Sequence, residues 1–212
     1  VKGERMQSGS PTEPLRLNRN RRAQSFWKCA AARILTTTLL LARTPAAFPA
    51  APPSKPSEYD VKAAYLVNFG RFLRLSKPAP GRSSFELCTL GHDPMNSSLD
   101  AFVDNTTIAG LPVRVNHLQD ISAAKSCAIV FISASESDRV REDLAILGNA
   151  DILTVSDAPD FLEHGGMIQF VLVSNHVRFA VNLEAVNRAH LILSSELLRV
   201  ASSVSGKPGG LP

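Results

Sequence analysis

The stretch CAIVFIS, residues 127–133, decides the fold of the chain, because it is apolar on both faces of the strand that it predicts. A strand is buried on both faces only inside a sheet that helices cover on either side. Further strand patterns lie at 85–90 (FELCTL) and 151–157 (DILTVSD), with helical patterns near 95–104 and after Ser135, which we expect to cap its helix. This alternation predicts an α/β fold with a mostly parallel central sheet flanked by helices.

An amphipathic helix over residues 58–74 should precede the first of these strands. Ser57 is a good N-cap and Asp60 stands three residues later, an arrangement typical of a capping box. Apolar residues recur at helical spacing and predict the buried face of this helix. They are Val61, Tyr65, Phe69 and Phe72, with Ala64 and Leu73 beside them.

The C-terminal third of the domain has a different pattern. Strand-like runs at 167–173 and 176–182 are separated by Ser174-Asn175, a two-residue hairpin signal, so we expect an antiparallel hairpin at one edge of the sheet. Asn182 is placed to cap one last helix that runs to about Ala201. The sequence SSVSGKPGGLP (202–212) predicts a disordered tail.

The positive charge of the chain is concentrated at its N-terminal end. Residues 1–50 hold nine Lys/Arg and two Glu, which leaves 14 of the 23 basic and 17 of the 19 acidic residues from position 51 onward, a net charge of −3. A mildly acidic domain argues against binding to nucleic acid. The basic stretch leads into the apolar run 34–42 and then into small residues and prolines, the order of a cleaved secretory signal.

These patterns divide the chain into four parts. We expect a signal or processing segment at 1–50, a linker at 51–57, an α/β domain at 58–201 and the tail at 202–212. The apolar run is too short for a permanent membrane span, since it would rise only about 14 Å as a helix. The sequence therefore predicts an exported, periplasmic protein, with a cytosolic protein that carries a basic tail as the alternative.

The cysteines of the exported chain predict one disulfide. Cys29 lies in the segment that should be removed, which leaves Cys88 and Cys127, and an even pair in an exported domain indicates a bond. Cys88 with His92 is a poor metal site, because zinc needs more ligands and no C-x-x-C or H-E-x-x-H motif is present. Cys88 is also a poor nucleophile, because it lies among apolar residues in mid-strand. We expect no metal and no cofactor.

Two glycine turns resemble catalytic or phosphate-binding motifs without completing them. GHDP (91–94) follows a strand but lacks the further glycines of a phosphate-binding loop, so it predicts a plain strand-to-helix turn. EHGGM (163–167) is similar to an esterase oxyanion turn, but the chain has no G-x-S-x-G elbow. The turn and its apolar flanks suit a partner contact better. Nothing in the sequence requires an enzyme.

Six stretches, taken in order, resemble the YfiR-like family of bacterial periplasmic proteins. They are VKAAYLVNFGRFL, FELCTLGHDP, SCAIVFIS, ILTVSDAPDFLEHGGMIQFVL, VRFAVNL and LILSSELLRVA, which together span about residues 58–201. The resemblance departs from the family at three places: RLSKP follows the first helix, Met95 follows the D-P pair, and His190 stands where a glycine is frequent. A second cysteine pair found in some relatives is absent from this sequence.

The resemblance implies a non-catalytic regulator that binds the periplasmic region of an inner-membrane diguanylate cyclase and represses it, which lowers cyclic-di-GMP and biofilm formation. It further implies an outer-membrane lipoprotein as a second partner and a redox effect through the disulfide of Cys88 and Cys127; a homodimer is also an expectation. The alternative is an exported sensor that binds a small molecule between Gly91 and the Ser156-Asp157 turn. Six residues are the candidate partner contacts: Phe161, Glu163, Gly165, Gly166, Met167 and Arg178.

Overall fold

The structure is a computed structural model that describes residues 55–75 and 82–206. The helices are α1 (Glu58–Phe72), α2 (Met95–Val103), α3 (Val140–Leu147), α4 (Leu183–Arg188) and α5 (Ser195–Val200), with 3-10 helices η1 (Ile121–Ser126) and η2 (Ala134–Arg139). The strands are β1 (Leu73–Leu75), β2 (Phe85–Leu90), β3 (Thr107–Ile108), β4 (Leu111–Leu118), β5 (Ile129–Ile132), β6 (Leu153–Ser156), β7 (Ile168–Val173), β8 (His176–Asn182), β9 (Leu191–Leu193) and β10 (Ser203–Ser205). The predicted signal segment at 1–50 and most of the linker lie outside the described residues.

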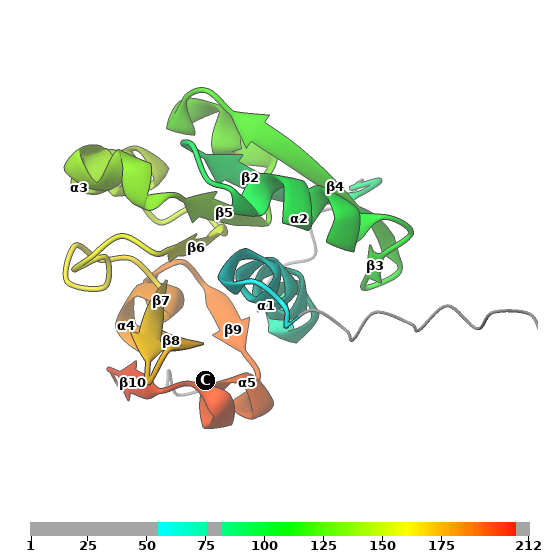
Figure 1. The fold of residues 1–212 in the computed structure, drawn as a ribbon. Coiled ribbons are helices and arrows are strands. Elements are labelled where there is room, and N and C mark those ends of the chain that lie inside the picture. The colour runs from blue at the N-terminus through cyan, green and yellow to red at the C-terminus, as the bar shows by residue number, and fades with distance from the viewer. Residues whose placement is uncertain (1–54, 76–81, 207–212) are drawn as a thin grey trace, which may run out of the picture. The chain divides into compact units, whose positions relative to one another are not determined.

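One mixed sheet organises the domain, with strand order β10-β8-β7-β6-β5-β2-β4-β3 (Figure 1). From β4 to β7 all neighbours are parallel, and β7 and β8 form the antiparallel hairpin. The CAIVFIS stretch supplies β5, which lies between β2 and β6 and is buried along its whole length. The predicted α/β fold with a mostly parallel sheet is confirmed.

The Ser57 capping box begins α1 as predicted, since Asp60 accepts from the Ser57 backbone N–H and the Asp60 N–H donates to the Ser57 hydroxyl. The predicted buried face of this helix is largely wrong. Phe69 is buried, but Val61, Ala64 and Tyr65 are only half-buried. The face turned to the core carries instead Lys62, Ala63, Leu66, Val67, Phe69 and Gly70. The helix is rotated toward the sheet at Gly70, where an added Cβ would lie 2.7 Å from Ile108 Cδ1.

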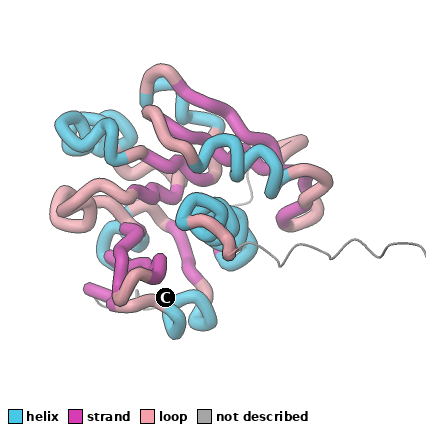
Figure 2. The backbone as a smooth tube through the Cα atoms, in the orientation of Figure 1, coloured by secondary structure: helices cyan, strands magenta, loops and turns pink. Residues whose placement is uncertain are grey.

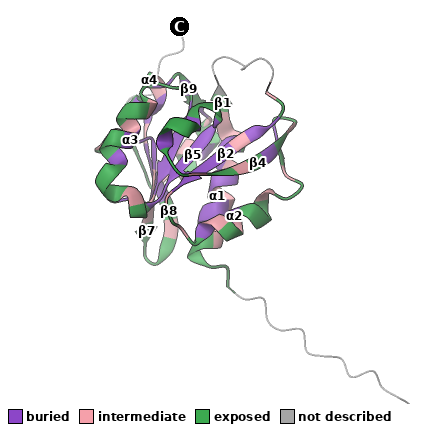
Figure 3. Ribbon diagram, turned by 90° about the horizontal axis from the view of Figure 1, so that it is seen from above, coloured by how far each residue is buried: buried purple, intermediate pink, exposed green. Residues whose placement is uncertain are grey.

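Two apolar cores lie on the two faces of the sheet, which Figure 3 shows as buried strands between helices. On the α1 face, Phe69 stacks on Phe170 with ring centroids 5.9 Å apart and meets Phe179 edge-on at 5.0 Å. On the other face, Cys88 and Cys127 share a cluster with residues of η1 and α3. The helices therefore divide into an α1 layer and an α3 layer, as the alternation of helix and strand up to β6 allows (Figure 2).

The predicted single C-terminal helix is wrong. Asn182 caps α4 as expected, by accepting from the Ala185 N–H, but α4 ends at Arg188. His190 has a φ of +55°, a left-handed conformation that no helix interior tolerates. Residues 191–193 then pair antiparallel with β1 as β9, and Ser194 caps the separate helix α5. The sequence LIL has the period of a strand, with its two leucines buried and Ile192 exposed.

Two further predictions differ from the structure. The ordered fold extends past 201, because β10 pairs in parallel with β8 and so covers the hairpin at the edge of the sheet. The predicted disordered tail is therefore wrong for residues 202–206, while 207–212 lie outside the described residues. Ser133 rather than Ser135 caps the helical segment after β5, by accepting from the Ser135 N–H, because that segment begins as η2 at Ala134.

Candidate functional site

The predicted disulfide between Cys88 and Cys127 is confirmed. The two Cα atoms lie 5.9 Å apart, within the range that a disulfide spans, and both residues are fully buried. Cys88 sits on β2, and Cys127 follows the last turn of η1, where its N–H donates to the Ala124 carbonyl. With both sulfurs bonded, neither cysteine is a nucleophile or a metal ligand. Among the described residues, no group of three His, Cys, Asp or Glu side chains is arranged to hold a metal.

The GHDP turn joins β2 to α2, as the sequence predicted. Gly91 has a φ of +88°, and a Cβ there would lie 2.5 Å from the Ser135 hydroxyl. Asp93 accepts from the Met95 N–H and starts α2. Burial raises the pKa of Asp93, although the hydrogen bond from Met95 opposes this shift. The turn is thus structural in its visible contacts.

A buried lysine lies at the carboxyl ends of the parallel strands. Nζ of Lys62 is 2.8 Å from Asp157 Oδ2 and 2.8 Å from Glu58 Oε1. Asp157 Oδ1 accepts from the Ala134 N–H. Burial disfavours the charged form of Lys62, but the hydrogen bonds to Asp157 and Glu58 outweigh it and raise the pKa of Lys62. These charges border a pocket of about 320 Å³ next to the hairpin, and they are paired with one another.

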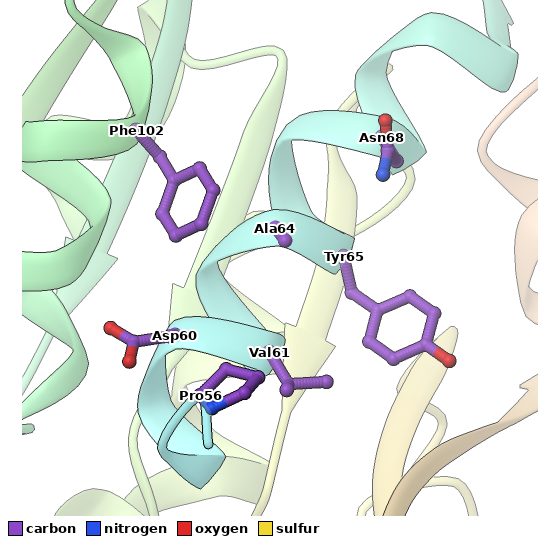
Figure 4. A pocket seen from close by; sticks show the side chains of 7 residues that line it. All are labelled: Pro56, Asp60, Val61, Ala64, Tyr65, Asn68 and Phe102. Atoms are coloured by element: carbon purple, nitrogen blue, oxygen red, sulfur yellow. The ribbon is translucent and has the colours of Figure 1, made fainter. Parts of the chain in front are cut away.

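An apolar groove runs along the half-buried face of α1. One part, of about 370 Å³, is drawn in Figure 4 and lies between α1 and Phe102 of α2. A second part, of about 530 Å³, continues toward the hairpin and shares three residues with the first, Pro56, Val61 and Tyr65. We call this surface the α1 groove. Its lining residues are Lys55, Pro56, Glu58, Asp60, Val61, Ala64, Tyr65, Asn68, Phe102, Leu172, Asn175, His176, Val177 and Arg178.

The walls of the α1 groove expose large apolar side chains. Phe102 is 44% exposed and Leu172 is 58% exposed, on opposite sides of α1. Solvent exposure of neighbouring large apolar residues on a folded domain is typical of a protein interaction site. Sequence reasoning missed this surface, because Val61, Ala64 and Tyr65, which line it, were assigned to the core face of α1.

The charged residues of the groove differ in whether another described residue binds them. Asp60 accepts from both Ser57 and Ser98, and Glu58 pairs with Lys62. Within the described residues, Lys55 and Arg178 have no hydrogen-bond or ion-pair partner. The groove therefore offers apolar walls and two positive charges that no other described residue pairs with.

The predicted contact residues fall in different environments. Phe161, Gly166 and Met167 are buried; the Phe161 ring occupies the space next to Gly166, where an added Cβ would lie 2.2 Å from it. Gly165 is half-buried with a φ of +96°, and Glu163 is exposed. Arg178 is exposed and lines the α1 groove, which none of the glycine-turn residues does. Of the six residues, only Glu163 and Arg178 are exposed.

A family model described as YfiR/HmsC-like matches residues 59–202, which is nearly all of the described domain. The chain belongs to the YfiR/HmsC-like family. Proteins of this family are known as periplasmic regulators, and the disulfide of this member fits that compartment. In the described part of the chain, no helix has the length and apolar character needed to cross a membrane.

Two solved structures are similar to this family member. One is a conserved domain protein from Vibrio cholerae, with 9% identity over 71% of this chain and a TM-score of 0.47. The other is the ABC domain from Streptococcus pneumonia in complex with L-Trp, with 12% identity over 68% of this chain and a TM-score of 0.50, a likeness of fold alone. The chain spans 60% of the length of each structure. No curated protein matches the chain in sequence.

Proposed function

We propose that the chain is a non-catalytic periplasmic regulator that binds the periplasmic region of an inner-membrane diguanylate cyclase and represses it. Repression lowers cyclic-di-GMP and, with it, biofilm formation. Membership of the YfiR/HmsC-like family supports the regulatory role, and the α1 groove is the observation that carries the binding. The regulator acts in trans through this groove.

The chemistry of the groove defines the partner segment. Apolar walls from Tyr65, Phe102 and Leu172 select a segment with apolar side chains along one face. Lys55 and Arg178, which have no ion-pair partner among the described residues, select a carboxylate next to that face, because the acidic groups of the groove are already bonded within the domain. An outer-membrane lipoprotein with the same kind of segment would compete for the groove and relieve repression.

A catalytic role has little support in the described residues. The nearest arrangement to a triad is Thr89 Oγ1, 2.8 Å from His117 Nδ1, with His117 Nε2 3.4 Å from Asp100. Thr89 is only 2% exposed and pairs with His117 across neighbouring strands. A hydroxyl so placed does not reach a substrate, so the three residues act as a cross-strand bridge to α2.

The test begins with the purified chain and the periplasmic region of the cyclase. Leu172→Asp places a charge on the exposed wall of the groove and should weaken binding at least tenfold, a loss of about 1.4 kcal/mol. Ile146→Asp is the matched control, because Ile146 is similarly exposed, at 51%, on α3 away from the groove. Equal binding by both variants would reject the groove as the docking surface.

The same variants test the cellular role. Deletion of the gene should raise cyclic-di-GMP, and the Ile146→Asp gene should restore repression while the Leu172→Asp gene should not. Unchanged cyclic-di-GMP on deletion, under both oxidising and reducing conditions, would reject the diguanylate cyclase as the target.

A small-molecule sensor is the second candidate. The pocket of about 320 Å³ beside Lys62 and Asp157 supports it, since ligands of open α/β sheets bind at the carboxyl ends of the strands. A thermal-shift screen with amino acids and nucleotides discriminates between the candidates. Saturable stabilisation that Lys62→Met abolishes would favour the sensor, and no stabilisation would remove it.

A further inference from the structure

Asp143 is a buried acid without a hydrogen-bond partner. It lies on α3 and is only 1% exposed, and neither of its carboxylate oxygens has a hydrogen-bond partner in the described part of the chain. A buried carboxylate in this position is unfavourable when it is charged, because it has lost its hydration and has no hydrogen bond in its place. No part of the proposed function uses this residue.

Asp143 belongs to the layer that covers the disulfide. Helix α3 packs against η1 above the face of the sheet opposite α1 (Figure 1). We call these two helices the α3–η1 cover. Ile121 and Ala124 of η1 and Val140 of α3 share one buried cluster with Cys88 and Cys127. Since both cysteines are fully buried, a reductant reaches their sulfurs only when this cover moves.

The charges around Asp143 do not compensate its burial. Burial raises the pKa of Asp143, and three acids add to the effect, Glu136 on η2, Glu142 on α3 and Asp120 at the start of η1. Arg139 on η2 opposes it but lies near Glu142, with Nε 3.9 Å from the Glu142 carboxylate. Lys125, in the last turn of η1, is exposed.

We propose that Asp143 makes the α3–η1 cover sensitive to pH, so that ionisation of this carboxyl loosens the cover and opens the Cys88–Cys127 bond to dithiol reductants. In the closed cover the neutral acid is tolerated. When the proton leaves, the carboxylate is stabilised by water, and only an open cover admits water. The device adds a pH condition to any redox change at this bond.

The direction follows from linkage. The carboxyl binds its proton more tightly in the closed cover than in the open one, where its pKa returns toward the ordinary 3.8. As the pH rises from 3.8 through the raised pKa of Asp143 in the closed cover, opening of the cover becomes progressively more favourable. Above that range the opening equilibrium is again independent of this group.

The redox step is an ordinary thiol–disulfide exchange. A thiolate of the dithiol attacks one sulfur, a mixed disulfide forms, and the thiolate of the other cysteine leaves and takes up a proton. The second thiol of the reductant then displaces the remaining cysteine as its own disulfide closes. Two electrons and two protons pass from the dithiol to Cys88 and Cys127.

The rate of reduction by dithiothreitol tests the proposal. Free cysteines of the purified chain are labelled over time between about pH 4 and about pH 8. The rate at each pH is divided by the rate at which dithiothreitol reduces oxidised glutathione at that pH, which removes the effect of the thiolate fraction of the reductant. The divided rate should rise severalfold with pH for the native sequence and stay flat for Asp143→Asn. Asp138→Asn, at an exposed acid on η2, should keep the native profile.

Hydrogen exchange gives a second measurement that needs no variant. After correction for the intrinsic pH dependence, amides of η1 and α3 should open more readily at about pH 8 than at about pH 4, while amides of α1 should not. A native reduction rate that is flat with pH would overturn the proposal. So would an Asp143→Asn profile as steep as the native one, or an α3–η1 cover that opens equally at both pH values.

Discussion

Nζ of Lys62 on α1 and Oδ2 of Asp157, in the loop after β6, lie 2.8 Å apart in a partly buried ion pair. The pair joins α1 to the carboxyl end of β6 in the central sheet. Glu58 is a second partner of Lys62, and the Ala134 N–H donates to Asp157. Both charges therefore have partners that replace the water they lose on burial.

Lys62→Met should destabilise the domain by about 3 kcal/mol, because it leaves the half-buried Asp157 without its counter-ion. Unfolding in urea, followed by circular dichroism, measures the loss. Lys55→Met removes an exposed lysine without an ion-pair partner in the described residues and should change the free energy of unfolding little. A loss for Lys62→Met no larger than this control would contradict a structural role for the pair.

Replacement of Cys88 and Cys127 by alanine should lower the free energy of unfolding by about 4 kcal/mol, since the bond closes a loop with a sequence separation of 39. Urea titrations with and without reductant provide the measurement. The double variant should unfold at the same midpoint in both conditions, whereas the native chain should shift. Insensitivity of the native chain to complete reduction would argue against the loop-closure contribution.

Asp60→Asn should destabilise α1 at neutral pH, because it removes the carboxylate that completes the capping box. Hydrogen bonds from Ser98 and Ser57 lower the pKa of Asp60 below 3.8. The carboxylate therefore stabilises the fold above pH 3.8, and this contribution disappears as the pH falls through the lowered pKa of Asp60 in the folded state. Urea midpoints of the two chains should converge only in that acidic range, and a constant difference would refute the assignment to the ionised group.

Gly166→Ala should cost about 2 kcal/mol, because its Cβ would lie 2.2 Å from the Phe161 ring. In the double variant with Phe161→Leu the methyl group gains space, so the combined loss should be smaller than the sum of the two single losses. Thermal or urea unfolding of the four chains gives this coupling energy. Strict additivity would mean that the ring and the glycine are energetically independent.

The elements that the sequence predicts well are those whose pattern allows only one environment. CAIVFIS is apolar on both faces and has no position except the middle of a covered sheet. Ser174 and Asn175 both adopt positive φ, as the two-residue hairpin requires, and Cys88 and Cys127 are the only cysteines among the described residues.

The α1 groove could not be assigned from the sequence, because α1 has apolar residues on more than one face. Val61, Ala64 and Tyr65 match a core stripe as well as the true one does, and the choice depends on where Gly70 lets the sheet approach. The break at His190 escaped prediction for a related reason. The period-two burial of Leu191 and Leu193 is imposed by pairing with β1, which lies more than a hundred residues earlier in the chain.

The sheet ends in very short strands on both sides, β3 with two residues and β10 with three. Each of them covers only part of the longer strand beside it, because β3 pairs with Leu111 and Pro112 of β4 and β10 pairs with residues 180–182 of β8. In the described part of the chain, residues 114–118 of β4 therefore pair with a strand on the β2 side alone. The short end strands reduce the free backbone edge of the sheet without removing it.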